Sequence, residues 1–179
     1  MKAARFIQRW RVRLGHVFAV ALVAAASPTG ESLAAGCAVA LAGAAYRVYA
    51  AGFIAKNEAL SRSGPYARTR NPLYFGSFVM YLGFSVASGS AYVLAAFLPF
   101  FFVVYFTTIR LEEEYLRGRF GVEFEEYAGA VPQFFPALRA RGGVRGAFRW
   151  ERVRANREYE GAAGCAVVIA ALVLKYLYL

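Results

Sequence analysis

The feature that most limits how this chain can fold is a set of long apolar runs. They cover residues 14–26, 32–55, 73–87, 91–109 and 161–179, the first being the shortest. About 20 helical residues cross the hydrocarbon core of a bilayer. Because the sequence is 59% hydrophobic and concentrates its apolar residues in such runs, it is typical of an integral membrane protein. We expect a single all-α membrane domain over residues 1–179, since no polar linker divides the chain.

The basic residues lie on alternate connections between the runs. Five Lys and Arg precede the first run, four lie within residues 56–70 and ten within residues 110–157, so these segments hold 19 of the 21. Cytoplasmic loops carry an excess of Lys and Arg. The pattern predicts five transmembrane helices, with the N-terminus inside, the C-terminus outside and a cytoplasmic helical connector between helices four and five. Residues 1–26 also fit a secretory signal peptide, and the topology of the rest holds whether or not they are cleaved.

Some functions are disfavoured by composition and placement. The net charge of +10 lies between apolar runs, so it indicates contact with membrane lipids rather than nucleic acid. The single histidine, His16, has no companion ligand, and Cys37 and Cys165 lie inside apolar runs without metal-ligand spacing. We therefore expect neither a metal site nor a Ser-His-Asp mechanism. The oligomeric state is left open, because Gly36 and Gly43 suit close helix packing within one chain or between chains.

Polar residues gather where the third helix is expected to begin, in the stretch SGPYARTRNPLYFGSF at residues 63–78. Asn71 is typical of a helix N-cap, and Pro72 suits the first helical position. With Arg68 and Arg70 beside it, this helix start predicts an anion site. The alternative is that the arginines only anchor the helix end while Asn71 only caps it.

Further charged residues lie near the expected membrane surface. Three consecutive glutamates, residues 112–114, follow the fourth helix; an anionic leaflet would repel them, so we expect them to face a cationic ligand or the earlier arginines. Arg154 and Glu158 belong to FRWERVRANREYE before the last helix, where lipid binding alone does not explain the glutamate. Arg47 lies two turns inside the second helix and is expected to snorkel or to pair with an acid in the bundle.

Three stretches together resemble a known pair of families. GPYARTRNPLYFG is similar to the Gly-Pro-Tyr and Arg-His-Pro-x-Tyr-x-Gly signature of the isoprenylcysteine carboxyl methyltransferase and phospholipid methyltransferase families. EEEYL is similar to their Glu-Glu-x-x-Leu, and FGVEFEEYAGAVPQFFP to their Phe-Gly, Tyr and Val-Pro-x-Phe-x-Pro continuation. The resemblance covers residues 43–160. It implies a membrane enzyme that binds S-adenosylmethionine at the cytoplasmic ends of its last helices and takes a lipid substrate from the bilayer.

Carried over residue by residue, the resemblance implies a cofactor site. Its members are Tyr66, Arg70, Asn71, Pro72, Tyr74, Gly76, Glu112 and Glu113. The helix start with Arg70 would suit the methionine carboxylate, and the two glutamates its ammonium group. Asn71 stands where the eukaryotic pattern has histidine, and an asparagine cannot act as an acid or base near neutral pH.

The acceptor would be a lipid-like or isoprenoid carboxylate, methylated on oxygen, or an amine, methylated on nitrogen. A carboxylate needs only a donor such as Arg47 or Arg154 to hold it, whereas an amine must lose a proton to a base such as Glu158 or Glu113. We favour the carboxylate, because Asn71 replaces the possible base. Two other classes remain: an NADPH-dependent membrane reductase of related fold, and a non-catalytic membrane protein whose basic loops bind anionic lipid.

Overall fold

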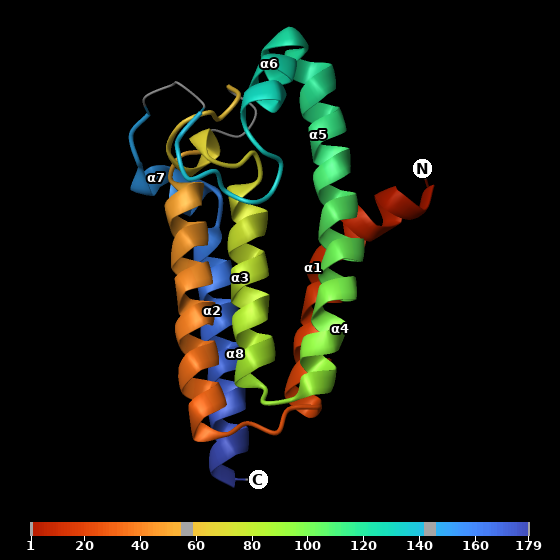
Figure 1. Cartoon of the computed structure of the whole chain (residues 1–179), viewed down its shortest axis with the longest axis vertical. Coiled ribbons are helices and arrows are strands. Elements are labelled where there is room, and N and C mark those ends of the chain that lie inside the picture. Colours follow the sequence, from red (N-terminus) through yellow and green to blue (C-terminus); the bar gives the residue numbers. More distant parts are fainter. Residues whose placement is uncertain (1, 55–58, 142–145, 179) are drawn as a thin grey trace.

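The structure, a computed structural model, describes residues 2–54, 59–141 and 146–178, with side chains from residue 10 onward. Every regular element in this part of the chain is helical. The elements are α1 (Lys2–Ala24), α2 (Gly30–Ala51), the 3-10 turn η1 (Gly64–Ala67), α3 (Pro72–Ala87), α4 (Ala91–Phe101), the π-helical η2 (Phe102–Phe106), α5 (Thr107–Phe120), α6 (Val122–Ala130), α7 (Trp150–Ala155) and α8 (Glu158–Tyr178). In Figure 1 the long helices lie side by side, and those adjacent in sequence run in opposite directions.

Three helices of the described part are long and apolar enough to cross a membrane. They are α2, the continuous helix Ala91–Phe120 that joins α4, η2 and α5, and α8. The apolar helix α3 is shorter, with 16 residues. The predicted all-helical membrane fold is confirmed, whereas the count of five crossings stays a prediction. The long connections, with α6 and α7, gather at the end of the bundle where the chain begins, and the C-terminus lies at the opposite end (Figure 1).

Small residues bring α2 and α3 into close contact. A Cβ atom added to Gly36 would lie 2.5 Å from the carbonyl oxygen of Gly83, and one added to Gly43 would lie 2.8 Å from that of Gly76. These pairs are seven residues apart on each helix, so the two backbones touch along two turns. Such small-residue contacts are a common basis of helix association in membranes. Gly36 and Gly43 therefore pack within the chain, one of the two arrangements that the sequence allowed.

An aromatic cluster fastens the loop after α6 to the helices. The ring of Phe134 lies 5.9 Å from that of Phe101 and 5.0 Å from that of Phe106, measured between centroids. Phe134 is 4% exposed and Phe101 is fully buried. Both partners flank or belong to η2, the irregular turn that follows Pro99 in the long helix. The bend expected at Pro99 stays a prediction, but the buried rings fix where the loop meets α4 and η2.

Candidate functional site

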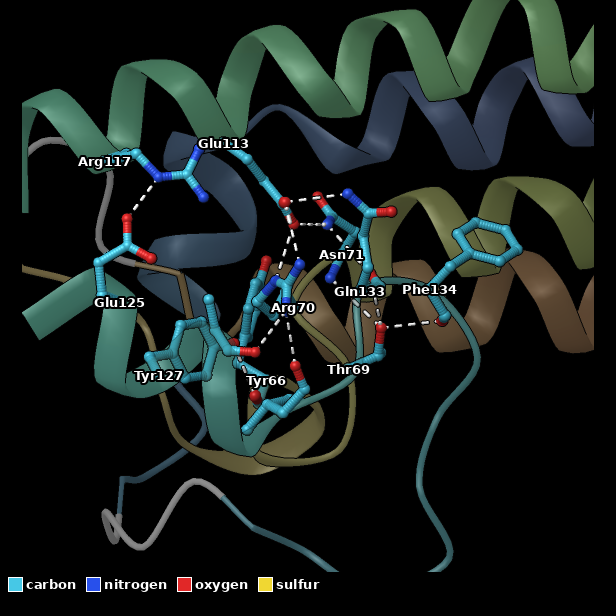
Figure 2. A network of polar contacts seen from close by, with 12 residues as sticks. Tyr66, Thr69, Arg70, Asn71, Glu113, Arg117, Glu125, Tyr127, Gln133 and Phe134 are labelled. Carbon is cyan, nitrogen blue, oxygen red and sulfur yellow. Dashed lines mark hydrogen bonds and ion pairs between the residues drawn. The ribbon is translucent and has the colours of Figure 1, made fainter.

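A buried ion pair joins the start of α3 to α5 (Figure 2). Arg70 donates from Nε to Oε1 of Glu113 over 2.8 Å and from Nη2 to Oε2 over 3.0 Å. Its Nη1 donates to the carbonyl oxygens of Ala128 and Val131, each over 2.8 Å. The two charged side chains are 13% and 9% exposed. The pair is therefore bidentate and largely withheld from water, the geometry in which such pairs are strongest.

Two amides complete the surroundings of Glu113. Asn71 Nδ2 donates to Oε1 over 2.9 Å, and Gln133 Nε2 donates to Oε2 over 2.9 Å (Figure 2). Asn71 occupies the N-cap position of α3, as predicted. The expectation that its side chain caps the helix is wrong, because it makes no capping hydrogen bond and its amide donates to Glu113 instead. The backbone carbonyl of Asn71 accepts from the N–H of Phe75 over 3.0 Å. Pro72 occupies the start of α3, as predicted.

In this structure Arg70 and Glu113 connect chain segments to one another. The sequence indicated that the glutamates face a cationic ligand or the earlier arginines, and Glu113 does face Arg70. Each oxygen of Glu113 already accepts two hydrogen bonds. Arg70 and Glu113 therefore bind each other rather than standing free for the carboxylate and ammonium of a ligand. Together they tie the loop before α3 and the loop after α6 to α5.

The neighbouring carboxylate, Glu112, has different partners. Arg11 on α1 donates from Nη1 to Glu112 Oε1 over 2.7 Å and to the phenol oxygen of Tyr74 over 2.8 Å. The Tyr74 phenol in turn donates to the same Oε1 over 2.7 Å. The side chains of Arg11 and Glu112 are 36% and 37% exposed. This triangle links α1, α3 and α5 and, unlike the Glu113 network, stays accessible.

A second buried pair lies between α2 and α8. Arg47 Nε donates to Glu158 Oε1 over 2.6 Å, and its Nη1 donates to Ser77 Oγ. Glu158 is 6% exposed. A Cβ atom on Gly76 would lie 2.6 Å from Arg47 Cγ, so the absence of a side chain there makes room for the arginine. Of the two possibilities for Arg47, pairing with an acid in the bundle is the one observed, in line with the expectation for ionisable residues at this depth.

The structure does not bring Arg154 to this pair. Arg154 is exposed on α7, outside the residues that contact Arg47 and Glu158. Its neighbour Asn156 donates to the backbone carbonyl oxygens of Ala51 and Ile54 over 3.3 and 3.4 Å, at the end of α2. The role expected for Arg154 in holding an acceptor stays a prediction.

Two cavities meet at Glu112. The smaller, of about 280 Å³, lies at the polar end and is lined by Tyr66, Arg70, Glu112, Arg119 and Tyr127 together with apolar side chains of α5. The larger, of about 390 Å³, extends among the helices, and Arg11, Arg47, Tyr74, Glu112 and Glu158 line its polar part. Its apolar walls come from α1, α3 and α8 and include Ala19, Met80, Phe84 and Val168. Glu112 and Ile54 line both cavities.

One residue that lines the smaller cavity has a buried polar atom without a partner. Tyr66 is 6% exposed and lines this cavity, and its phenol oxygen has no hydrogen-bond partner among the described residues. Burial raises the pKa of Tyr66 well above its ordinary value, so the phenol stays protonated and remains a donor. A buried donor without a partner carries a free-energy cost. A ligand acceptor in this cavity would remove that cost.

Several members of the site were not predicted from the sequence. Arg11, Ser77 and Gln133 enter only through the folded arrangement, although Gln133 lies in the VPQFFP stretch that carried part of the family resemblance. Within the described ranges no group of three or more His, Cys, Asp or Glu side chains is placed to hold a metal ion. His16 lines the larger cavity.

Comparisons with known proteins identify the family to which the chain belongs. A family model described as phospholipid methyltransferase matches residues 16–123, which contain the first two of the three stretches above and end within the third. The cobalt-zinc-cadmium resistance protein CzcN of Cupriavidus metallidurans is 40% identical over 83 residues. The nickel-cobalt-cadmium resistance protein NccN of Alcaligenes xylosoxydans xylosoxydans is 36% identical over 83 residues.

Each alignment with these two relatives covers 46% of this chain and 38% of the relative, so the matched part spans well under half of their length. No solved structure matches the chain. The family model, by contrast, extends over more than half of the chain and includes Glu112 and Glu113 together with Arg70, Asn71 and Tyr74. The chain belongs to the phospholipid methyltransferase family.

Proposed function

We propose that this protein is an integral membrane methyltransferase that uses S-adenosylmethionine to methylate a lipid-like acceptor. Family membership supports the reaction class. The assignment of the two ligands rests on the two cavities, one at the polar end and one among the apolar helices. Glu112 and Ile54 line both of them, so the cavities are adjacent. A transfer reaction needs its two reactants held side by side, and adjacent cavities meet that need.

The smaller cavity suits the cofactor. S-adenosylmethionine supplies a methyl group on a positively charged sulfonium, and it also carries an ammonium and a carboxylate. In this cavity the Glu112 carboxylate offers a partner for positive charge, Arg119 lies on its wall, and the buried Tyr66 phenol offers a donor. Three other predicted members, Asn71, Pro72 and Gly76, act by shaping the site: Asn71 holds Glu113, Pro72 starts α3, and Gly76 admits Arg47.

The larger cavity suits the acceptor. Its apolar walls would take a hydrocarbon chain, and its polar part would take the head group beside Glu112 and Glu158. Both arginines that line it are already paired, Arg11 with Glu112 and Arg47 with Glu158. A carboxylate acceptor would have to displace a glutamate, whereas an amine would meet carboxylate oxygens and a possible base in Glu158. These pairs therefore favour an amine over the carboxylate that Asn71 alone suggested.

The same proposal includes a topology. We place the connection that carries α6 and α7 on the cytoplasmic side together with the connection between α2 and α3, because residues 110–157 and 56–70 hold ten and four of the 21 Lys and Arg. The chain then crosses the membrane five times, counting α1 and α3, with the N-terminus and the site inside and the C-terminus outside. The basic segment around α7, with the exposed Trp150, would lie at the headgroups and contact membrane lipids.

Binding measurements on the detergent-purified protein test this function. We expect saturable binding of S-adenosylmethionine, weakened by Glu112→Gln and Tyr66→Phe and unchanged by Arg117→Gln, a surface variant. Transfer of a labelled methyl group to single-chain amines and carboxylates would then identify the acceptor class. Binding of NADPH instead would support the reductase, and binding of neither ligand in detergent or in vesicles would support the non-catalytic alternative.

A further inference from the structure

Arg11 lies outside the segment that the family model matches, yet it contacts Glu112, which lines both cavities. It belongs to α1, and its guanidinium reaches Glu112 on α5 and Tyr74 on α3. The guanidinium also lies over the Tyr74 ring, with 5.9 Å between Arg11 Cζ and the ring centroid, in a cation–π contact. The Arg11 side chain thus forms part of the polar lining of the larger cavity.

The contacts of Arg11 restrict how Glu112 can turn. Arg11 and Tyr74 both donate to Oε1 of Glu112, and they also bind each other. A half-exposed glutamate with only one partner keeps much of its rotamer freedom. A ligand that binds such a side chain must fix its rotamer, which costs side-chain conformational entropy. With two mutually bonded donors on one oxygen, the carboxylate is oriented before a ligand arrives. Glu113, by comparison, is fixed entirely by residues of the family segment and its adjoining loop.

We propose that Arg11 is a positioning residue that acts on ligand binding through Glu112, which makes α1 part of the binding site. This proposal rests on the proposed function, because it takes Glu112 as the carboxylate that meets the positive charge of S-adenosylmethionine. Arg11 itself does not line the smaller cavity. Its effect on the cofactor therefore passes through the orientation of the carboxylate.

A double-mutant cycle on S-adenosylmethionine binding tests the proposal. The four proteins are the wild type, Arg11→Gln, Glu112→Gln and the double variant, each measured by equilibrium binding without acceptor and by thermal unfolding. We expect Arg11→Gln to weaken binding about tenfold, the order of one charge-assisted hydrogen bond, and Arg11→Lys to recover part of it. In the Glu112→Gln background the Arg11 change should have no further effect, since the residue through which it acts is gone.

Lys175 provides the matched control. It also fastens α1, donating to the carbonyl oxygens of Val23 and Ala24 over 2.9 and 2.7 Å, but at the far end of the bundle from both cavities. Lys175→Met should lower the unfolding temperature and leave the dissociation constant unchanged. If Lys175→Met weakens binding as Arg11→Gln does, or if the Arg11 effect persists in the double variant, Arg11 only fastens α1 and the proposal is wrong. Unchanged or tighter binding in Arg11→Gln also overturns the proposal for Arg11. If the wild type binds no S-adenosylmethionine, both the proposed function and the proposal for Arg11 are wrong.

Discussion

Replacing Glu113 by Gln should destabilise the protein more than any single change on its surface. The substitution keeps the shape of the side chain but removes the charge that balances Arg70, which is 13% exposed. Breaking a buried ion pair by removing one partner costs about 3–5 kcal/mol, because the other charge is left uncompensated. For a chain of this size, about 2–4 °C per kcal/mol gives a fall of about 6–20 °C in the unfolding temperature.

The exposed pair Arg117 and Glu125 is the control for this prediction. Its side chains are 51% and 53% exposed, and it also joins α5 to α6. Such surface pairs contribute little to stability, so Glu125→Gln should leave the unfolding temperature nearly unchanged. Thermal unfolding in a fixed detergent, followed by circular dichroism, measures both variants. Equal small shifts would show that burial and the four hydrogen bonds to Glu113 do not stabilise the loops before α3 and after α6.

Three further changes test other parts of the structure. Gly43→Ala should cost about 1–3 kcal/mol of unfolding free energy, since its Cβ would lie 2.8 Å from the Gly76 carbonyl oxygen, whereas Gly129→Ala, with nothing within 4 Å, should be neutral or stabilising in the same thermal assay. Tyr66→Phe should weaken S-adenosylmethionine binding about threefold to tenfold without lowering the stability of the ligand-free protein, because it removes a buried donor that has no partner. Alkaline titration gives a separate test of Tyr66. Burial of the phenol holds its folded-state pKa above the ordinary value of 10, so this group leaves stability unchanged below pH 10 and lowers it as the pH rises from 10 through the folded-state value; Tyr66→Phe should reduce this alkaline loss, which other buried tyrosines such as Tyr127 share.

Much of the candidate site could be anticipated from local sequence. The clustering of Arg70, Asn71 and Glu113 was expected from motifs, and the structure places the three in contact. What those contacts are was not expected, because a motif does not show which donor faces which acceptor. The side chain of Asn71 has two suitable uses, capping the helix or donating to a carboxylate, and the approach of α5 selects the second.

The helical membrane character follows from the sequence alone, because a lipid environment requires every backbone polar group to bond within its own segment and the apolar runs have the length for it. The family follows from motifs of that same sequence. The partners of the charged residues depend on the tertiary structure: Arg47 and Glu158 are 111 residues apart, and Arg11 and Glu112 are 101 apart. Local periodicity carries no information about contacts at such separations. They arise where helix packing, set partly by the small residues of α2 and α3, brings a few buried charges within reach of opposite ones.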